Sequence, residues 1–258
     1  PYAGAFLTEG NDIGDRSDTI MLLRVDPNES QAAILSFPRD LWVKIGTSNR
    51  KSRINSAFDK GDPSRLVQTI ELNFDLPVDH LSVATGSVGL IYQLVQAFCD
   101  PGDEVVFAWR SFEAYPIAVT AAAATAVKVP VLADGRHDLD AMAAAITDRT
   151  RVVLVCTPNN PTGPAVTQAE LDAFLAKVPS RVLVVVDEAY VEFVRMDDPV
   201  DGLATYRSHS NVVLTRTFSK AYGLAGLRVG YLCAHPELVA VMERVRESFN
   251  VNLPGLAA

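Results

Sequence analysis

Cysteine is scarce in this chain of 258 residues, and it lacks the spacing of a disulfide framework or a metal site. The three cysteines, Cys99, Cys156 and Cys233, are odd in number, form no C-x-x-C pair and lie in apolar segments. They predict buried free thiols in a reducing compartment, so we expect a cytoplasmic protein.

Long apolar runs and excess positive charge are missing as well. No stretch reaches the roughly 18 to 20 apolar residues that cross a bilayer, and residues 1–20 lack the charged-then-apolar order of a signal peptide. The net charge of −8 and the pI near 5.0 argue against nucleic acid or an anionic membrane as the main partner. We therefore expect small-molecule ligands, no nucleic-acid partner and no membrane segment in this chain.

Apolar residues make up 48% of the chain, which is enough for a packed core. From Glu104 onward, short β-branched runs alternate with segments of helix length. The predicted strands are Val105–Ala108, Ala126–Val131, Val152–Cys156, Val182–Val186, Val212–Leu214 and Val229–Cys233. Several are apolar without alternation, which is typical of strands buried on both faces. The pattern predicts an α/β fold with a mainly parallel sheet, helices on both faces and ligands at the carboxyl ends of the strands.

Residues 1–80 differ in character, with apolar runs at 20–25 and 32–37 and a basic loop from Lys44 to Arg53. The change comes near residues 79–82 without a flexible linker, which is unusual for a natural domain boundary. We therefore predict a partial α/β segment over residues 1–80 and a larger α/β domain over residues 81–258. The junction gives the chain the character of a chimera.

The clearest motif surrounds Lys220, in the segment 215–231. Lys220 follows a predicted strand, with hydroxyl groups at Thr217 and Ser219 and a guanidinium at Arg228. Hydroxyl groups and arginine suit a phosphate dianion. A lone Ser-Lys pair is more often a solvated surface lysine, but the whole segment favours a cofactor site.

A second predicted strand, Val182–Val186, ends in Asp187 and is followed closely by Tyr190. A carboxylate at the end of a buried strand needs a cationic partner, because burying it unpaired is costly. A protonated pyridine nitrogen is such a partner, and Tyr190 can donate to a phenolic oxygen on the same ring. Taken alone, Asp-Glu-Ala-Tyr is as often a helix start or a pair of metal-binding carboxylates.

Two further loops follow predicted strands. Residues 156–163, Cys-Thr-Pro-Asn-Asn-Pro-Thr-Gly, combine turn formers with two amides, as a ligand loop does, although an ordinary turn fits them equally well. Residues 84–89, Ala-Thr-Gly-Ser-Val-Gly, precede the helical segment Leu90–Phe98, so their N–H groups can meet a phosphate at a helix N-terminus. The run is not G-x-G-x-x-G, which disfavours a dinucleotide site.

Together these motifs resemble the fold-type I aminotransferases that use pyridoxal phosphate, over roughly residues 82–258. The runs Ala108–Pro116 and Arg216–Arg228 resemble the histidinol-phosphate aminotransferases in particular. The resemblance implies the large domain of that fold, pyridoxal 5'-phosphate as cofactor, and amino transfer from histidinol phosphate to a 2-oxo acid in histidine biosynthesis. Other amino donors, aromatic ones included, stay open.

The resemblance also implies a role for each motif residue. Lys220 would bind the cofactor covalently and move the proton at the substrate α-carbon, and Asp187 would pair with the pyridine nitrogen. Phe112 would stack on the ring, while Asn160 and Tyr190 would hold its phenolic oxygen. The implied phosphate site consists of Ser87, Val88, Thr217, Ser219 and Arg228.

The family assembly implies a homodimer. Its amino-terminal arm and its carboxy-terminal small domain, which carries the arginine for the substrate carboxylate, have no counterpart in these 258 residues. Cofactor binding is therefore the better supported expectation, and we expect little turnover from this chain alone.

Residues 1–80 carry a second set of charged pairs, Arg16 with Asp18 and Arg39 with Asp40. Alternating arginine and aspartate suit a pyrophosphate with a divalent metal, although surface ion pairs give the same pattern. The segment resembles part of the LytR-CpsA-Psr family of membrane-anchored phosphotransferases, in which the arginines would bind the pyrophosphate and the aspartates would lie near the metal. A cell-wall glycopolymer phosphotransferase and a non-catalytic chimeric fragment are therefore the alternatives to the aminotransferase.

Overall fold

The computed structural model describes residues 20–26, 31–37, 42–45, 51–53, 78–248, 250 and 251. Contacts divide the chain into two compact units, Pro1–Val78 with Leu253–Ala258, and Asp79–Asn252. Within the described residues, no helix is both long and apolar enough to cross a membrane.

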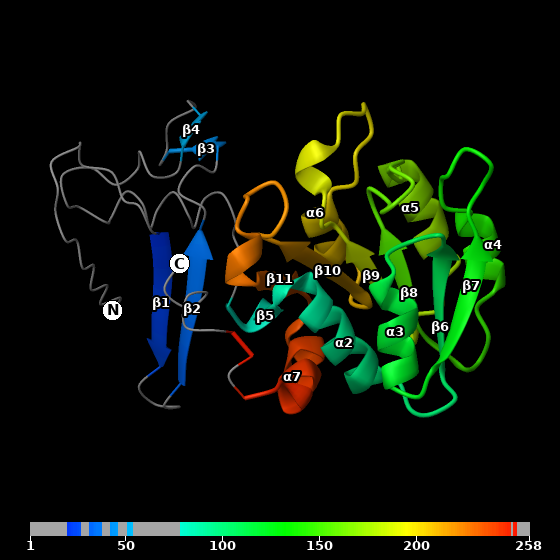
Figure 1. Cartoon of the computed structure of the whole chain (residues 1–258), viewed down its shortest axis with the longest axis horizontal. Helices are drawn as coiled ribbons and strands as arrows, with labels where there is room; N and C mark the ends of the chain where they lie inside the picture. The colour runs from blue at the N-terminus through cyan, green and yellow to red at the C-terminus, as the bar shows by residue number, and fades with distance from the viewer. Residues whose placement is uncertain are drawn as a thin grey trace, which may run out of the picture. The chain divides into compact units, whose positions relative to one another are not determined.

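The described part of the first unit consists of two antiparallel strand pairs (Figure 1). One pair is β1 (Ile20–Asp26) with β2 (Gln31–Phe37), and the other is β3 (Trp42–Lys44) with β4 (Lys51–Arg53). The two apolar runs of this part lie in β1 and β2. Its charged candidates lie outside the described residues; they are Arg16, Asp18, Arg39 and Asp40.

The second unit is built on a seven-stranded sheet with the order β5-β11-β10-β9-β8-β6-β7. Its strands are β5 (Leu81–Thr85), β6 (Glu104–Trp109), β7 (Thr125–Pro130), β8 (Thr150–Cys156), β9 (Leu183–Asp187), β10 (Val212–Thr217) and β11 (Val229–Cys233). The strands from β10 to β7 are parallel, whereas β11 runs antiparallel to β10 and β5. The prediction of a mainly parallel α/β sheet is confirmed.

The antiparallel direction of β11 follows from its short connection to β10. Residues 218–228 join the two strands with only a 3-10 turn, η4 (Ala225–Leu227), between them. A parallel return requires a crossover of about a dozen or more residues, usually a helix. The chain therefore reverses directly, and the connection that carries Lys220 stays at the edge of the sheet where β10 ends.

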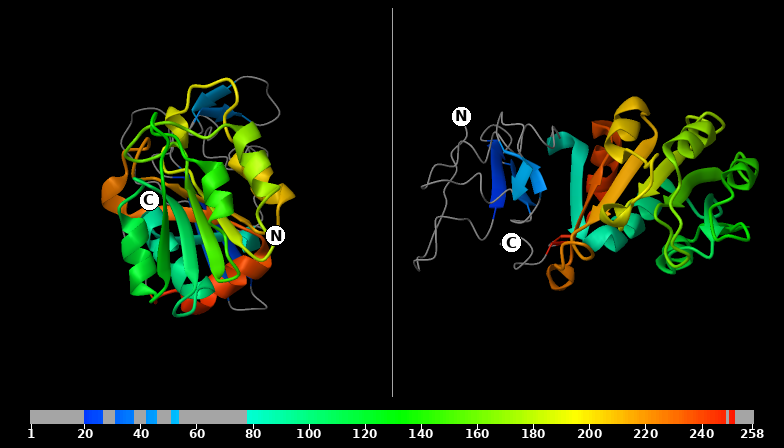
Figure 2. Two further views of the ribbon diagram at one scale, coloured as in Figure 1. Left: turned by 90° about the vertical axis from the view of Figure 1, so that its right-hand side faces the viewer. Right: turned by 90° about the horizontal axis from the view of Figure 1, so that it is seen from above.

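Helices cover both faces of this sheet (Figures 1 and 2). One face carries α2 (Gly86–Phe98), α3 (Ala114–Ala121) and α7 (Pro236–Val245), whose apolar side chains join those of the strands in one core. The other face carries α4 (Leu139–Ala144), α5 (Gln168–Leu175) and α6 (Gly202–Ser208). Every residue of β9 is buried, as its uninterrupted apolar sequence predicts for a strand covered on both sides.

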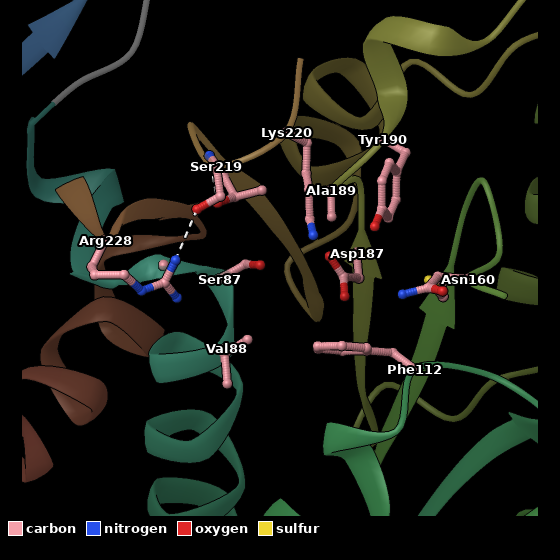
Figure 3. A pocket seen from close by; sticks show the side chains of 13 residues that line it. Ser87, Val88, Phe112, Asn160, Asp187, Ala189, Tyr190, Ser219, Lys220 and Arg228 are labelled. Carbon is pink, nitrogen blue, oxygen red and sulfur yellow. Dashed lines mark hydrogen bonds between the residues drawn. The ribbon is translucent and has the colours of Figure 1, made fainter. Parts of the chain in front are cut away.

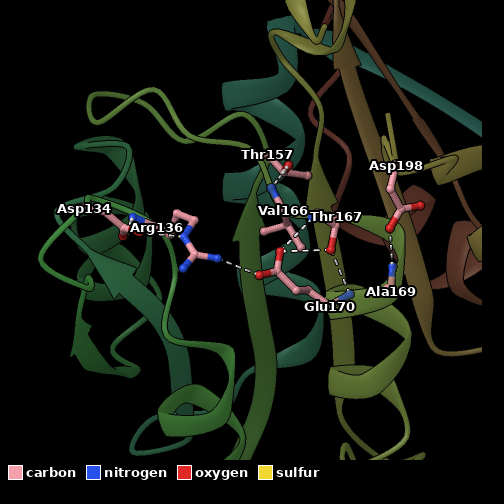
Figure 4. A network of polar contacts seen from close by, with 8 residues as sticks. All are labelled: Asp134, Arg136, Thr157, Val166, Thr167, Ala169, Glu170 and Asp198. Carbon is pink, nitrogen blue, oxygen red and sulfur yellow. Dashed lines mark hydrogen bonds and ion pairs between the residues drawn. The ribbon is translucent and has the colours of Figure 1, made fainter. Parts of the chain in front are cut away.

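Polar contacts fix the start of α5 at the carboxyl end of β8 (Figure 4). The Thr167 hydroxyl accepts from the Glu170 N–H at 3.0 Å, and the Glu170 carboxylate accepts from the Thr167 N–H at 2.9 Å, which is a capping box. Arg136, from the loop after β7, pairs with Glu170 at 2.9 Å, and Asp198 accepts from the Ala169 N–H at 3.1 Å. These contacts hold three loops together on this side of the sheet.

Gly230 lies where β11 passes close to the start of α2. A Cβ at this position would overlap the backbone of Gly86 and Ser87, so a side chain here forces the strand and the helix apart. We predict that Gly230→Ala lowers the free energy of unfolding by about 2 kcal/mol through overpacking. Gly226→Ala is the matched control, because nothing lies within 4 Å of a Cβ there. Urea denaturation measures both, and an unchanged midpoint for Gly230→Ala would contradict the packing described.

Candidate active site

A pocket opens at the carboxyl edge of the sheet (Figure 3). The residues that line it are Gly86, Ser87, Val88, Phe112, Cys156, Asn160, Asp187, Ala189, Tyr190, Thr217, Ser219, Lys220 and Arg228. All ten residues that the motifs single out for a cofactor are among them. They come from segments far apart in the sequence, and they meet because parallel strands bring their carboxyl ends to one edge.

Asp187 is the most deeply buried charged group in the pocket, with 2% of its surface exposed. The Tyr115 hydroxyl donates to its Oδ2 at 2.8 Å, and the Thr215 hydroxyl donates to its Oδ1 at 3.2 Å. Burial raises the pKa of the Asp187 carboxyl, and the two hydrogen bonds oppose the rise because they stabilise the charged form. A carboxylate held in this way favours a cationic ligand group.

Lys220 enters the same pocket from the connection between β10 and β11. Its side chain is directed toward Asp187 and lies beside Tyr190 (Figure 3). The Nζ atom is 5.2 Å from the centre of the Tyr190 ring, and its positive charge acts to lower the pKa of Asp187. An amine in such a pocket can bind a carbonyl compound covalently.

The end of the pocket at α2 is suited to an anion. The helix begins without a side-chain cap and without an acidic residue in its first turn, so its first N–H groups can meet a ligand. Arg228 donates from Nη1 to Ser219 Oγ at 3.1 Å, and the Ser219 N–H donates to Thr217 Oγ1 at 3.2 Å. A Cβ on Gly86 would lie 2.9 Å from Arg228 Nη2, so glycine lets the guanidinium approach the helix.

Apolar and aromatic side chains line the space between the two ends. Phe112 and Val88 lie on one side of the pocket, and Ala189 and Tyr190 lie on the other (Figure 3). Asn160 lies near Tyr190, away from the end that carries Arg228. A flat ring with an anionic group at one edge fits this distribution of side chains.

The sequence interpretation missed the two residues that hold Asp187. Thr215 stands beside Asp187 in the parallel register of β9 and β10, and a register between distant strands cannot be read from one sequence. Tyr115 comes from the first turn of α3, three residues after Phe112. Phe112 precedes the helix, so no helical spacing in the sequence pointed to this contact.

Asn159, the first amide of the Asn-Asn pair, supports the pocket without lining it. It is buried, its Oδ1 accepts from Ser111 Oγ at 2.7 Å, and its Nδ2 donates to Thr162 Oγ1 at 2.7 Å. The bond from Ser111 joins the loop that carries Phe112 to the loop that carries Asn160, and the bond to Thr162 lies within the latter loop. Asn159 therefore stabilises the loops, whereas Asn160 lines the pocket.

Glu188, the neighbour of Asp187, does not line the pocket and has its own partner. The Arg216 Nε and Nη2 atoms lie 2.8 and 2.7 Å from Glu188 Oε2, and the carboxylate is buried. Nowhere in the described part of the chain do three or more His, Cys, Asp or Glu residues gather in a way that could hold a metal. Because Arg216 holds Glu188 away from the pocket lining, the two neighbouring carboxylates do not face one common site.

Two family models match parts of this chain. Residues 68–258 match the model of the family described as aminotransferase class I and II. The chain belongs to this family. Residues 7–84 match the model of the LytR_cpsA_psr family, so the second resemblance is confirmed as well, over the first part of the chain.

Curated relatives of this chain are named aromatic amino acid aminotransferases. The one from Streptomyces avermitilis is 55% identical over 189 residues, which cover 73% of this chain and 53% of the relative. The one from Rhodococcus jostii is 58% identical over 187 residues, which cover 70% of this chain and 52% of the relative. The chain thus spans about half the length of the curated relatives it matches.

Solved structures share the fold of the second unit. The histidinol-phosphate aminotransferase from Sinorhizobium meliloti, solved in complex with pyridoxal-5'-phosphate, gives a TM-score of 0.65 at 30% identity. The match covers 69% of this chain and 48% of that structure. The N-succinyldiaminopimelate aminotransferase from Mycobacterium tuberculosis gives 0.65 at 27% identity, covering 70% of this chain and 49% of that structure.

The burial of Asp187 predicts a pH-dependent cost of folding in the cofactor-free protein. A carboxyl whose pKa is higher in the folded chain than in the unfolded chain binds its proton more tightly when folded. The folded state therefore loses stability as the pH rises above 3.8, the ordinary pKa of an aspartate. We predict that Asp187→Asn raises the free energy of unfolding at pH 7 by about 1 kcal/mol, and that the gain disappears at pH values below 3.8.

Urea denaturation across this pH range measures the effect. Asp172→Asn, at an exposed carboxylate of α5, is the control for loss of a negative charge elsewhere. A loss of stability at pH 7 in Asp187→Asn, larger than that of the control, would contradict the stated cost of burying the carboxylate.

Proposed function

We propose that the second unit binds pyridoxal 5'-phosphate at Lys220 and transfers amino groups from an aromatic amino donor to a 2-oxo acid. One observation carries the proposal: a lysine amine and a buried carboxylate face the same pocket, whose other end is an uncapped helix N-terminus beside an arginine. Pyridoxal phosphate needs these three features, an amine, an acid partner for its ring nitrogen and a phosphate site.

Each end of the pocket fits one part of this cofactor. Asp187 would keep the pyridine nitrogen protonated, which lets the bound ring act as an electron sink. The phosphate would lie at the α2 end, where it meets helix N–H groups, a guanidinium and hydroxyl groups. The residues proposed for this contact are Ser87, Val88, Thr217, Ser219 and Arg228.

The remaining lining residues would orient the ring and handle the proton. Phe112 would pack on one face of the ring, and Asn160 and Tyr190 would hydrogen bond its phenolic oxygen. The Lys220 amine is the basic group in the pocket that can take the proton from the substrate α-carbon and return it to the cofactor side.

Aromatic amino acids are the first choice of donor because curated relatives that are more than half identical over the aligned residues carry that name. Histidinol phosphate, which the motifs around Phe112 and Lys220 predict, is the second choice. It is supported by the structural similarity to the histidinol-phosphate aminotransferase from Sinorhizobium meliloti at 30% identity. Both kinds of donor carry a planar ring one methylene group away from the carbon that bears the reacting amine.

A homodimer is the assembly we propose for the aminotransferase, following the family expectation. Two large apolar side chains of the second unit, Ile117 and Phe193, are each 59% exposed, which suits residues that a partner covers. For the first unit, the family match over residues 7–84 supports a link to cell-wall phosphotransferases. The proposed pyrophosphate and metal contacts there are Arg16, Arg39, Asp18 and Asp40.

Amino transfer is tested by loading the 258-residue protein with pyridoxal phosphate, removing the excess, and adding tyrosine, phenylalanine or histidinol phosphate. We predict formation of the matching oxo product from the aromatic donors, and none in Lys220→Ala. Lys177→Ala, at a partly exposed lysine that pairs with Asp140 outside the pocket, is the control. Binding of the cofactor without conversion of any donor would contradict the proposed reaction.

Repeated turnover with a 2-oxo acid should be slow, even if the loaded cofactor converts one equivalent of the donor. A substrate carboxylate is ordinarily held by a bidentate arginine, and among the described pocket residues the only arginine is Arg228, which we assign to the phosphate. We predict a kcat/KM about 100-fold or more below that of the full-length Streptomyces avermitilis relative, in a coupled assay of glutamate formation from 2-oxoglutarate. Equal rates would show a substrate site that the described residues do not reveal.

A further inference from the structure

We propose that Tyr115 is a positioning residue for the cofactor's ring nitrogen, acting through Asp187. The inference rests on the proposed function, since it concerns the carboxylate that would pair with that nitrogen. It assigns to the Tyr115 hydroxyl two tasks: fixing the orientation of the Asp187 carboxylate and keeping it ionised inside the protein.

The geometry of Tyr115 leaves its hydroxyl little freedom. The side chain has 0% of its surface exposed. Its ring meets Phe107 and Phe112 edge to face, with centroids 5.7 and 5.6 Å apart. Aromatic pairs in this arrangement hold a ring in place, so the hydroxyl is presented to Asp187 Oδ2 at 2.8 Å from a fixed direction.

Asp187 receives one hydroxyl donor on each oxygen. Tyr115 donates to Oδ2, and Thr215 donates to Oδ1 at 3.2 Å from the neighbouring strand. A carboxylate bonded at both oxygens cannot turn about its terminal bond without breaking one of them. Both bonds also stabilise the charged form against the cost of burial, which is the form that pairs with a protonated nitrogen.

One short element therefore sets two features of the ring site. Phe112 lines the pocket just before α3, and Tyr115 lies in the first turn of that helix. The two rings touch each other, so a displacement of α3 moves the ring wall and the Asp187 donor together. Cys156, a further pocket residue close to both Tyr115 and Asp187, has a pKa of about 12 because of its burial, so it stays a neutral thiol beside them.

A double-mutant cycle on cofactor affinity tests this role without measuring turnover. The dissociation constant of pyridoxal phosphate is measured for the wild type, Tyr115→Phe, Asp187→Asn and the double variant. We expect Tyr115→Phe to weaken binding about 10-fold, because a hydrogen bond to a charged group is lost. In the Asp187→Asn background the same change should cost less than about threefold, because the charge is gone.

Tyr206→Phe is the control, at a fully buried tyrosine of α6 that does not line the pocket, and it should leave the affinity unchanged. Thr215→Val, which removes the donor to Oδ1, should weaken binding in the same direction and serves if Tyr115→Phe does not fold. Equal affinity in wild type, Tyr115→Phe and Thr215→Val would overturn the inference alone. An equal loss from Tyr115→Phe in both backgrounds would also overturn it, because the tyrosine would then act through packing. Absence of binding in the wild type would overturn the proposed function as well.

Discussion

The buried carboxylate of Asp187 is the constraint around which the second unit is arranged. A charge at the end of a fully buried strand is unfavourable, and the protein supplies it with two hydroxyl donors and a nearby amine rather than with a fixed ion pair. The adjacent Glu188 shows the contrast, because it is paired directly with Arg216. Asp187 can thus still pair with a cationic group of a ligand, whereas Glu188 is already paired with Arg216.

The pocket around Asp187 forms because of the direction of the strands. The common direction of β5, β6, β8, β9 and β10, together with the direct reversal from β10 to β11, brings five segments of the chain to the same edge of the sheet. Gly86 and Gly230 let the start of α2 lie close to both Arg228 and β11, so the anion end stands across the pocket from Asn160 and Tyr190. Stability and ligand binding are opposed at this point, because the group that favours the ligand destabilises the cofactor-free fold.

Much of this arrangement could be predicted from the sequence. Uninterrupted valine-rich runs predicted the buried strands, and polar motifs directly after them predicted where ligand contacts would gather. The supporting residues could not be predicted in the same way. Thr215 depends on the pairing of two distant strands, and Asn159 differs from Asn160 only in the direction its side chain takes. The motifs also leave the choice of amino donor open.

Reductive trapping of the cofactor tests the central claim most directly. The 258-residue protein is incubated with pyridoxal phosphate and reduced with borohydride, and the attachment site is mapped by mass spectrometry of its peptides. The account predicts a single major adduct on the peptide that contains Lys220, and loss of that adduct in Lys220→Ala. Modification spread over exposed lysines, with Lys220 unmodified, would contradict it.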